Sequence, residues 1–229
     1  MIAETERSRD RVVVVGASGG IGQALADAAE ARGAVIRLSR PAIDARDEAT
    51  IAAAAERAGD GLTHVIVAAG LLHARGQGPE RDWRQISADW MLESFRVNTV
   101  LPALVAKHFL PRLRRDGPSL FAVLTARVGS IGDNRLGGWH AYRASKAALN
   151  MILRNLAVEM GRSHPKAVIA GLHPGTVDTG LSAPFQKGVA EGRLFTADHS
   201  AERLLAVLSG LTPADSGGVF AWDGARVPE

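Results

Sequence analysis

The sequence predicts a single doubly wound α/β domain with a parallel sheet of about seven strands. Three observations lead to this fold class. Short apolar runs alternate with longer segments of helical periodicity. The first apolar run ends in a glycine-rich turn directly before a helical pattern, and no repeat, low-complexity segment or linker divides the 229 residues. We therefore expect one domain over residues 1–229, with residues 1–10 as a flexible leader.

Six runs predict buried strands, since each is short, apolar and bounded by glycine, proline or polar residues. They cover residues 11–16, 34–40, 63–70, 119–125, 167–175 and 217–224. The segments between them show helical spacing of apolar residues, which predicts helices over residues 21–33, 49–59, 89–115, 140–162 and 200–211. Gly33 is a plausible C-terminal cap of the first helix. Pro102 and Pro111 are expected to kink or end the third.

Composition excludes several classes of protein. A hydrophobic content of 46% with 22% charged residues is typical of a globular chain. There is no cysteine, and the seven histidines form no H-x-x-H or H-E-x-x-H pattern, so we expect no metal site. The formal charge of +3 comes without a basic run, which argues against a nucleic-acid partner. Without a membrane-length apolar run or a secretory signal, the expected location is the cytoplasm, with no membrane partner.

The segment VVVVGASGGIG places Gly16, Gly20 and Gly22 between the first strand and the first helix. Glycine lets the backbone approach a pyrophosphate, and the helix N-terminus offers free N–H groups to that anion. The strand–turn–helix context favours a dinucleotide site over a tight turn without a ligand. Ser18 and Ile21 of the same turn are then expected to contact the cofactor.

One tyrosine and one lysine stand four residues apart in the helix expected over residues 140–162. At this spacing Tyr142 and Lys146 share a face of the helix. An ammonium beside a phenol lowers the pKa of the phenol, which would prepare Tyr142 for proton transfer. The alternative from local sequence alone is an ordinary surface pair on a helix.

Together these patterns resemble the short-chain dehydrogenase/reductase family, which has a Rossmann-like fold. The resemblance spans almost the whole chain. The matching positions are Gly16, Gly20 and Gly22 of the phosphate loop, Tyr142 and Lys146 of the Y-x-x-x-K pair, Asn98 in FRVNT, and residues 173–179, HPGTVDT. The run RVGSIGDNRLGGWHAYRASKAALNM and the ending FAWDG further resemble the C-factor/sniffer-like carbonyl reductase branch.

The resemblance implies an oxidoreductase that transfers a hydride between a nicotinamide and a carbonyl or secondary alcohol. Tyr142 would be the proton donor or acceptor, and Lys146 would lower its pKa and hold the ribose. Asn98 would hold a water that continues the proton relay. A dinucleotide-binding regulatory or signalling protein with weakened catalysis is the alternative.

The end of the second predicted strand indicates which cofactor is used. It reads IRLSR, with Ser39 and Arg40 and no acid. A guanidinium binds a 2′-phosphate and an acid would repel it, so we expect NADP(H), with NAD as the alternative. Asp44 matches the adenine-contacting aspartate of the family, or is a turn residue. The N-N-A-G segment of the family appears as VAAG, so Ala69 and Gly70 would approach the cofactor through their backbone.

The resemblance places a further segment at the cofactor. Backbone of Pro174, Gly175 and Val177 would meet the nicotinamide amide, and Thr179 would lie close to the phosphates. The usual catalytic serine of the family is absent.

The position of that serine is Ala126 in the segment VLTARVGSI. Thr125 precedes it and faces away from the pocket unless a bulge reverses the strand. Ser130 lies in the following loop, and either hydroxyl is a candidate for the missing hydrogen bond. Trp139 and Phe185 are candidates for the walls of the substrate pocket, or are core or interface residues.

The helices expected from residues 89 and 140 carry more apolar residues than one sheet-facing stripe requires. A second apolar side is usually buried elsewhere. In the family these helices pair across a two-fold axis, so we expect a homodimer or a homotetramer.

Overall fold

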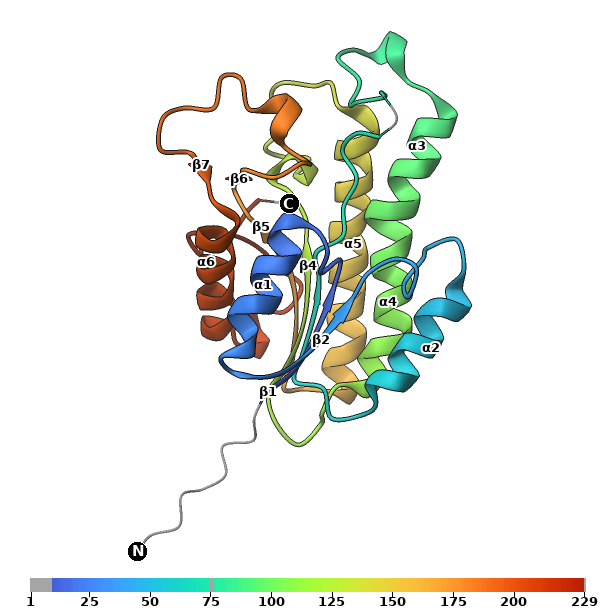
Figure 1. The fold of residues 1–229 in the computed structure, drawn as a ribbon, viewed down its shortest axis with the longest axis vertical. Coiled ribbons are helices and arrows are strands. Elements are labelled where there is room, and N and C mark those ends of the chain that lie inside the picture. Colours follow the sequence, from blue (N-terminus) through green and yellow to red (C-terminus); the bar gives the residue numbers. More distant parts are fainter. Residues whose placement is uncertain (1–9, 75, 229) are drawn as a thin grey trace, which may run out of the picture.

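The computed structural model describes residues 10–74 and 76–228, so the expected leader lies outside the described residues except for Asp10, which begins β1. The main sheet is parallel, with the strand order β2-β1-β3-β4-β5-β8 (Figure 1). Its strands are β1 (Asp10–Val15), β2 (Gly33–Leu38), β3 (His64–Val67), β4 (Ser119–Leu124), β5 (Ala167–His173) and β8 (Val219–Ala221). This arrangement confirms the doubly wound α/β fold.

The main sheet holds six strands where about seven were expected. Two further short strands of the described chain, β6 (Thr176–Val177) and β7 (Leu194–Phe195), pair with each other and form a separate sheet. Residues 39–47, which follow β2, form turns and an isolated bridge instead of another strand of the main sheet.

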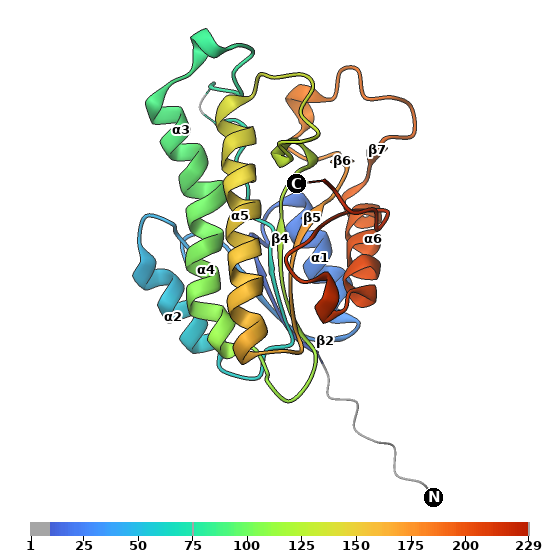
Figure 2. The ribbon, with the colours of Figure 1, turned by 180° about the vertical axis from the view of Figure 1, so that it is seen from behind.

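Helices cover both faces of the sheet. They are α1 (Gly20–Glu30), α2 (Glu48–Ala58), α3 (Ala88–Phe95), α4 (Leu101–Phe109), α5 (His140–Ser163) and α6 (Ala197–Gly210). The two opposite views show α1 and α6 on one face and α2, α4 and α5 on the other (Figures 1 and 2). Alternate strand residues supply the two cores: Val13 and Val15 pack with the α2, α4 and α5 side, and Val12 and Val14 with the α1 and α6 side.

The helix expected over residues 89–115 is divided, but not at Pro102. After α3, residues Arg96–Val100 form a π-helical turn, and Pro102 lies in the first turn of α4, where its missing N–H is tolerated. A short 3₁₀ turn, Leu110–Arg112, ends the segment at Pro111. The π-helical turn contains Asn98, and such turns are frequent at functional sites.

The cap expected at Gly33 is wrong. Helix α1 ends at Glu30, and Gly33 begins β2. A Cβ atom at Gly33 would lie 2.0 Å from the carbonyl oxygen of Asp10, so the close approach of the two strands explains the glycine.

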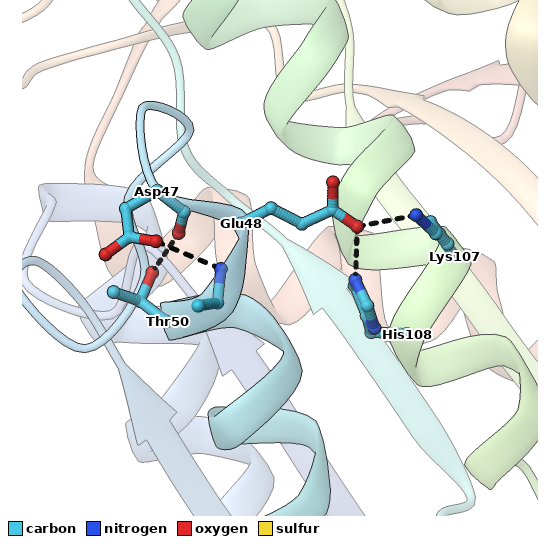
Figure 3. A network of polar contacts seen from close by, with 6 residues as sticks. Asp47, Glu48, Thr50, Lys107 and His108 are labelled. Carbon is cyan, nitrogen blue, oxygen red and sulfur yellow. Dashed lines mark hydrogen bonds and ion pairs between the residues drawn. The ribbon is translucent and has the colours of Figure 1, made fainter.

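The start of α2 is fixed by a small polar network (Figure 3). Asp47 caps the first turn, and the Thr50 hydroxyl donates a 2.7 Å hydrogen bond to the Asp47 carbonyl. Glu48 Oε1 accepts from Lys107 Nζ of α4 at 2.6 Å and contacts His108 Nε2 at 2.8 Å. These hydrogen bonds, that of Lys107 first, lower the pKa of Glu48. The network fixes the start of α2 and connects it to α4.

Strand β1 marks the point where the chain changes direction across the sheet. It pairs with β2 on one side and with β3 on the other. The connection from β1 runs through α1 on one face, and the connection from β3 runs through α4 on the opposite face (Figures 1 and 2). In open α/β sheets, ligands bind in the crevice outside the carboxyl ends of the strands at such a point.

Candidate active site

A cavity of about 950 Å³ lies at this point of the sheet. Of the residues singled out from the sequence, it is lined by Ser18, Gly20, Ile21, Gly22, Ser39, Arg40, Asp44, Ala69, Gly70, Thr125, Tyr142, Lys146, Pro174 and Thr179. Ligand pockets range over roughly 300–1,000 Å³, so this cavity has room for a large ligand.

The glycine loop forms one end of the cavity. Gly16 has a φ of +87°, and a Cβ atom there would lie 2.7 Å from the backbone nitrogen of Ala69. A Cβ atom at Gly22 would lie 2.2 Å from the Gly16 carbonyl oxygen. Helix α1 begins at Gly20 without a side-chain cap and without an acid in its first turn. Its first N–H groups and its dipole therefore fit a pyrophosphate.

The next part of the wall lies at the end of β2. The Ser39 hydroxyl accepts a 3.0 Å hydrogen bond from the Ser18 N–H, which ties this strand to the glycine loop. Arg40 is exposed, lines the cavity, and has no ion-pair partner within the part of the chain that the structure describes. Asp44 lines the cavity and also accepts from the Arg46 N–H at 2.9 Å, so the cofactor and turn interpretations are compatible.

Tyr142 and Lys146 form the other end of the cavity. Lys146 Nζ lies 5.9 Å from the centroid of the Tyr142 ring and donates to the Leu124 carbonyl at 2.8 Å. Burial lowers the pKa of Lys146 to about 7 and raises the pKa of Tyr142 to about 12. The predicted lowering of the Tyr142 pKa is therefore wrong for this structure, because burial disfavours the charged phenolate. The phenol is protonated at neutral pH.

Asn98 lies near this pair but does not line the cavity. Its Oδ1 accepts from the Leu71 N–H at 2.8 Å, and its Nδ2 donates to the Leu71 carbonyl at 2.9 Å and to Ser145 Oγ at 3.1 Å. Asn98 therefore fastens the loop after β3 to the helix that carries Tyr142. Its role in a water relay stays a prediction.

The two candidates for the missing serine differ in what their hydroxyl groups contact and in their place relative to the cavity. Thr125 lines the cavity, but its Oγ1 donates to Asn150 Oδ1 of α5 at 2.7 Å. Ser130 is buried outside the walls of the cavity, and its Oγ accepts from the Asp133 N–H at 3.1 Å. Because Ser130 does not line the cavity, its role as the second hydrogen-bond donor stays a prediction.

The segment after β5 divides between two sites. Pro174 and Thr179 line the main cavity, and a Cβ atom at Gly20 would lie 2.7 Å from Thr179 Cγ2. Gly175 instead lines a second cavity of about 220 Å³, and Val177 is buried with its carbonyl accepting a hydrogen bond from a serine hydroxyl. Neither Gly175 nor Val177 lines the main cavity, so their expected cofactor contacts stay predictions.

The two aromatic candidates lie beside the catalytic pair. The Trp139 ring is 6.2 Å from the Tyr142 ring and 5.3 Å from the Phe185 ring, both edge-on. The Phe185 ring also lies 5.8 Å from His73, whose Nε2 contacts the Gly180 carbonyl at 3.0 Å. This aromatic cluster connects the loop after β3 with the segment after β5. Neither Trp139 nor Phe185 lines the main cavity directly.

Sequence reasoning missed several residues of the wall. The cavity is also lined by Arg46, Leu71, His73, Gln77, Trp90, Glu93 and Arg96. The position of the loop after β3 could have predicted its place in the cavity wall, because ligands bind at the carboxyl ends of parallel strands. For Trp90, Glu93 and Arg96 no local pattern distinguishes these positions from an ordinary helix surface.

Membrane-spanning helices and metal-binding groups of side chains are both absent from the described residues. In residues 10–74 and 76–228, no helix is long and apolar enough to cross a membrane. Within the same ranges, no group of three or more His, Asp or Glu side chains could hold a metal ion.

Residues 37–222 match the sequence model of a family described as enoyl-(acyl carrier protein) reductase. The match covers most of the chain and includes the Y-x-x-x-K pair. The chain therefore belongs to the short-chain dehydrogenase/reductase family, in agreement with the resemblance seen in its motifs.

Two curated proteins illustrate the relationship. The C-signal of Myxococcus xanthus is 35% identical over 139 residues, which cover 60% of this chain and 78% of that protein. The 1-hydroxy-2-glutathionyl-2-methyl-3-butene dehydrogenase of a Rhodococcus species is 33% identical over 129 residues, covering 56% of this chain and 54% of that enzyme. The match thus spans little more than half of the dehydrogenase.

Solved structures share the fold over nearly the whole chain. NADPH-bound carbonyl reductase from chicken fatty liver is 27% identical, with a TM-score of 0.78, and the match covers 96% of this chain and 100% of that one. Carbonyl reductase Sniffer of Drosophila melanogaster is 20% identical, with a TM-score of 0.79 and the same coverage. At that identity the likeness to Sniffer shows the fold alone.

Proposed function

We propose that this chain transfers a hydride between NADP(H) and a carbonyl compound or secondary alcohol, with Tyr142 as the proton donor or acceptor. One observation carries the proposal. One cavity has the glycine loop at one end and the Tyr142–Lys146 pair at the other. A dinucleotide bound at the first end reaches toward a proton donor at the second.

The family to which the chain belongs makes it an oxidoreductase, and NADP(H) is the cofactor that we propose for it. The NADPH-bound carbonyl reductase that it resembles at 27% identity supports this cofactor. So does Arg40, which follows β2 and has no ion-pair partner among the described residues, at the position where a 2′-phosphate would lie.

The protein's part in the reaction follows from the protonation states of its residues. When bound, NADPH supplies the hydride. The Tyr142 phenol, with its pKa raised to about 12 by burial, is present as the acid and donates its proton to the carbonyl oxygen. The Lys146 ammonium, present below its lowered pKa of about 7, stabilises the tyrosinate left behind. The site therefore favours carbonyl reduction at neutral or mildly acidic pH.

Steady-state NADPH oxidation tests this function. A panel of small ketones, aldehydes and quinones is expected to contain substrates, and the rate is expected to fall as the pH rises through about 7. Tight NADPH binding without turnover on the whole panel would contradict the proposed reaction.

A signalling role is the second candidate, favoured by Ala126. A carbonyl oxygen that gains charge needs a second donor, but Thr125 donates to Asn150 Oδ1 and Ser130 does not line the cavity. The C-signal of Myxococcus xanthus, at 35% identity, adds weight to this candidate. Ala126→Ser separates the two: a rise in turnover of about tenfold or more supports an enzyme with an incomplete donor set, and no turnover in either protein supports the signalling role.

A homodimer or homotetramer remains our proposal for the assembly. Leu92 of α3 and Met151 and Val158 of α5 are exposed by 63%, 62% and 51%, and α3 packs beside α5. These apolar side chains lie on neighbouring helices and offer a surface for a second copy. Light scattering at micromolar concentration is expected to give a multiple of 24.1 kDa, and a mass of 24.1 kDa would contradict it. The cytoplasmic location stays a prediction, which cell fractionation would test.

A further inference from the structure

The catalytic helix α5 starts without a cap of its own. Its N-cap residue, Trp139, is left-handed with a φ of 51° and makes no side-chain cap hydrogen bond, and the first turn contains no acid. The first N–H groups of a helix need partners from outside it. Tyr142 lies in this same first turn, so the order of the turn determines where the phenol is held.

Glu80 supplies the missing cap from a distant loop. Its two carboxylate oxygens accept from the Ala141 N–H at 3.3 and 3.1 Å, across a separation of 61 residues. Its backbone carbonyl accepts from the Trp139 N–H at 2.5 Å. A carboxylate at a helix N-terminus also interacts favourably with the helix dipole. Glu80 thus binds the start of α5 through both its side chain and its backbone.

The burial of Glu80 is unusual for an acid. The residue is 3% exposed, and within the described ranges no Lys, Arg or His lies within ion-pair distance of its carboxylate. A buried carboxylate is unfavourable unless its hydrogen bonds compensate. Among the described residues, the Ala141 N–H at the start of α5 provides the hydrogen bonds that offset the burial of the Glu80 carboxylate.

The same residue connects two walls of the cavity. Glu80 lies in the loop that follows β3, in which Leu71, His73 and Gln77 line the cavity. Its partner Ala141 immediately precedes Tyr142, the proton donor. Displacement of this cap would move the phenol relative to the bound substrate, and misplacement of about 1 Å can lower a rate about 100-fold.

We propose that Glu80 is a positioning residue, which holds the first turn of α5 and with it the Tyr142 phenol against the substrate side of the cavity. The proposal rests on the proposed function of Tyr142. It assigns Glu80 no contact with substrate or cofactor.

The test uses three variants of the full chain. Glu80→Ala removes the cap, and Glu80→Gln keeps an oxygen that can accept from the Ala141 N–H. Asp47→Ala is the matched control, because it removes the cap of α2, a helix without a residue in the cavity wall. For each we would measure the melting temperature, the NADPH Kd and kcat at saturating NADPH.

Since the chain has one tyrosine, a ¹³C-labelled tyrosine gives a single NMR resonance that reports on Tyr142 directly. Glu80→Ala is expected to lower kcat by about 10- to 100-fold, leave the NADPH Kd within about twofold, and shift or broaden the resonance. Glu80→Gln is expected to restore most of kcat and the native resonance. Asp47→Ala is expected to lower only the melting temperature.

Three results would overturn the proposal: native kcat and resonance in Glu80→Ala, an equal loss of kcat in Asp47→Ala, or no rescue by Glu80→Gln. If Glu80→Ala does not fold, Glu80→Asp, one methylene shorter, takes its place with the same expected loss. If the wild-type chain reduces no carbonyl, the proposed function fails, whereas the tyrosine resonance still decides the role of Glu80.

Discussion

The two ends of the main cavity are built in different ways. The phosphate end is one continuous segment, in which β1 turns through the glycine loop directly into α1. The catalytic end is assembled from distant parts: Tyr142 on α5, the loop after β3, and the segment after β5. Contacts at the first end are mostly made by the backbone: the Gly19 N–H donates to the Gly16 carbonyl at 3.0 Å, and the Gly16 N–H donates to the Leu38 carbonyl at 2.7 Å. Those at the second are side-chain contacts such as Asn98 with Leu71, 27 residues away, and Glu80 with Ala141, 61 residues away.

This difference has a functional consequence. A site made of one tight turn depends on the absence of side chains, so added atoms there are expected to damage binding. A site held by long-range contacts depends on particular polar groups, so their removal is expected to damage turnover. Substitutions at the two ends are therefore expected to separate Kd from kcat.

The largest effect is expected at the catalytic end. Tyr142→Phe removes only the hydroxyl and is expected to lower kcat by about 10² to 10⁴, because the proton donor is lost. The NADPH Kd is expected to stay unchanged, since the glycine loop is untouched. Single-turnover kinetics and a binding titration measure the two quantities. A variant that keeps most of its activity would remove Tyr142 from the reaction.

The opposite result is expected at the phosphate end for Gly22→Ala. The new Cβ atom would lie 2.2 Å from the Gly16 carbonyl oxygen and would push α1 away from the loop. We expect the NADPH Kd to rise by about 100-fold, which corresponds to about 2.7 kcal/mol.

Gly161→Ala on α5 is the matched control for that variant. A Cβ atom there meets nothing within 4 Å, so binding is expected to be unchanged and the helix slightly stabilised. Calorimetric titration of both variants with NADPH checks the pair, and equal affinities would show that the glycine loop does not hold the phosphates.

The same contrast explains which features were predictable from the sequence. The strand-forming runs, the glycine loop and the Tyr142–Lys146 spacing are local patterns, and the structure places them as expected. The π-helical turn at Asn98 was mistaken for a kink at Pro102, because its cause is tertiary packing around Leu71 and Ser145.

Burial is the physical quantity that local sequence could not supply. The directions of the Tyr142 and Lys146 pKa shifts come from desolvation, which depends on elements far away in the chain. The same holds for Thr125, whose hydroxyl is taken by Asn150, and for Glu80, which has no neighbouring motif to mark it as a cap.

A smaller effect is expected where a side chain acts at the cofactor end. Arg40→Asp replaces an attraction for the 2′-phosphate with a repulsion, so the NADPH Kd is expected to rise by about 10-fold or more while the NADH Kd stays within about twofold. Arg57→Asp near the end of α2, outside the cavity wall, is the charge-matched control and is expected to change neither constant. If the NADPH Kd of Arg40→Asp, like that of Arg57→Asp, equals the wild-type value, Arg40 is a solvated surface residue.

The smallest effect concerns stability at the catalytic end. Lys146 has its pKa lowered by burial from 10.5 to about 7, so below about pH 7 the folded chain bears the full cost of a buried ammonium. Between these two values the unfolded chain binds more protons than the folded one, and wild-type stability rises with pH. Lys146→Met removes this dependence and keeps an apolar side chain in place. The variant is expected to melt several degrees above the wild type near pH 6, at about 2–4 °C per kcal/mol, with the gap shrinking toward pH 10.

Lys107→Met is the control for that comparison, since the Lys107 side chain is 62% exposed and no such pH-dependent gap is expected there. A Lys146→Met protein that melts below the wild type at acidic pH would show that the hydrogen bond to the Leu124 carbonyl outweighs the desolvation of the ammonium. A higher melting temperature of Lys146→Met near pH 6, together with its loss of activity, would mean that the Lys146 ammonium is kept for the reaction although it destabilises the fold. The phosphate end, which is built from backbone, carries no such penalty.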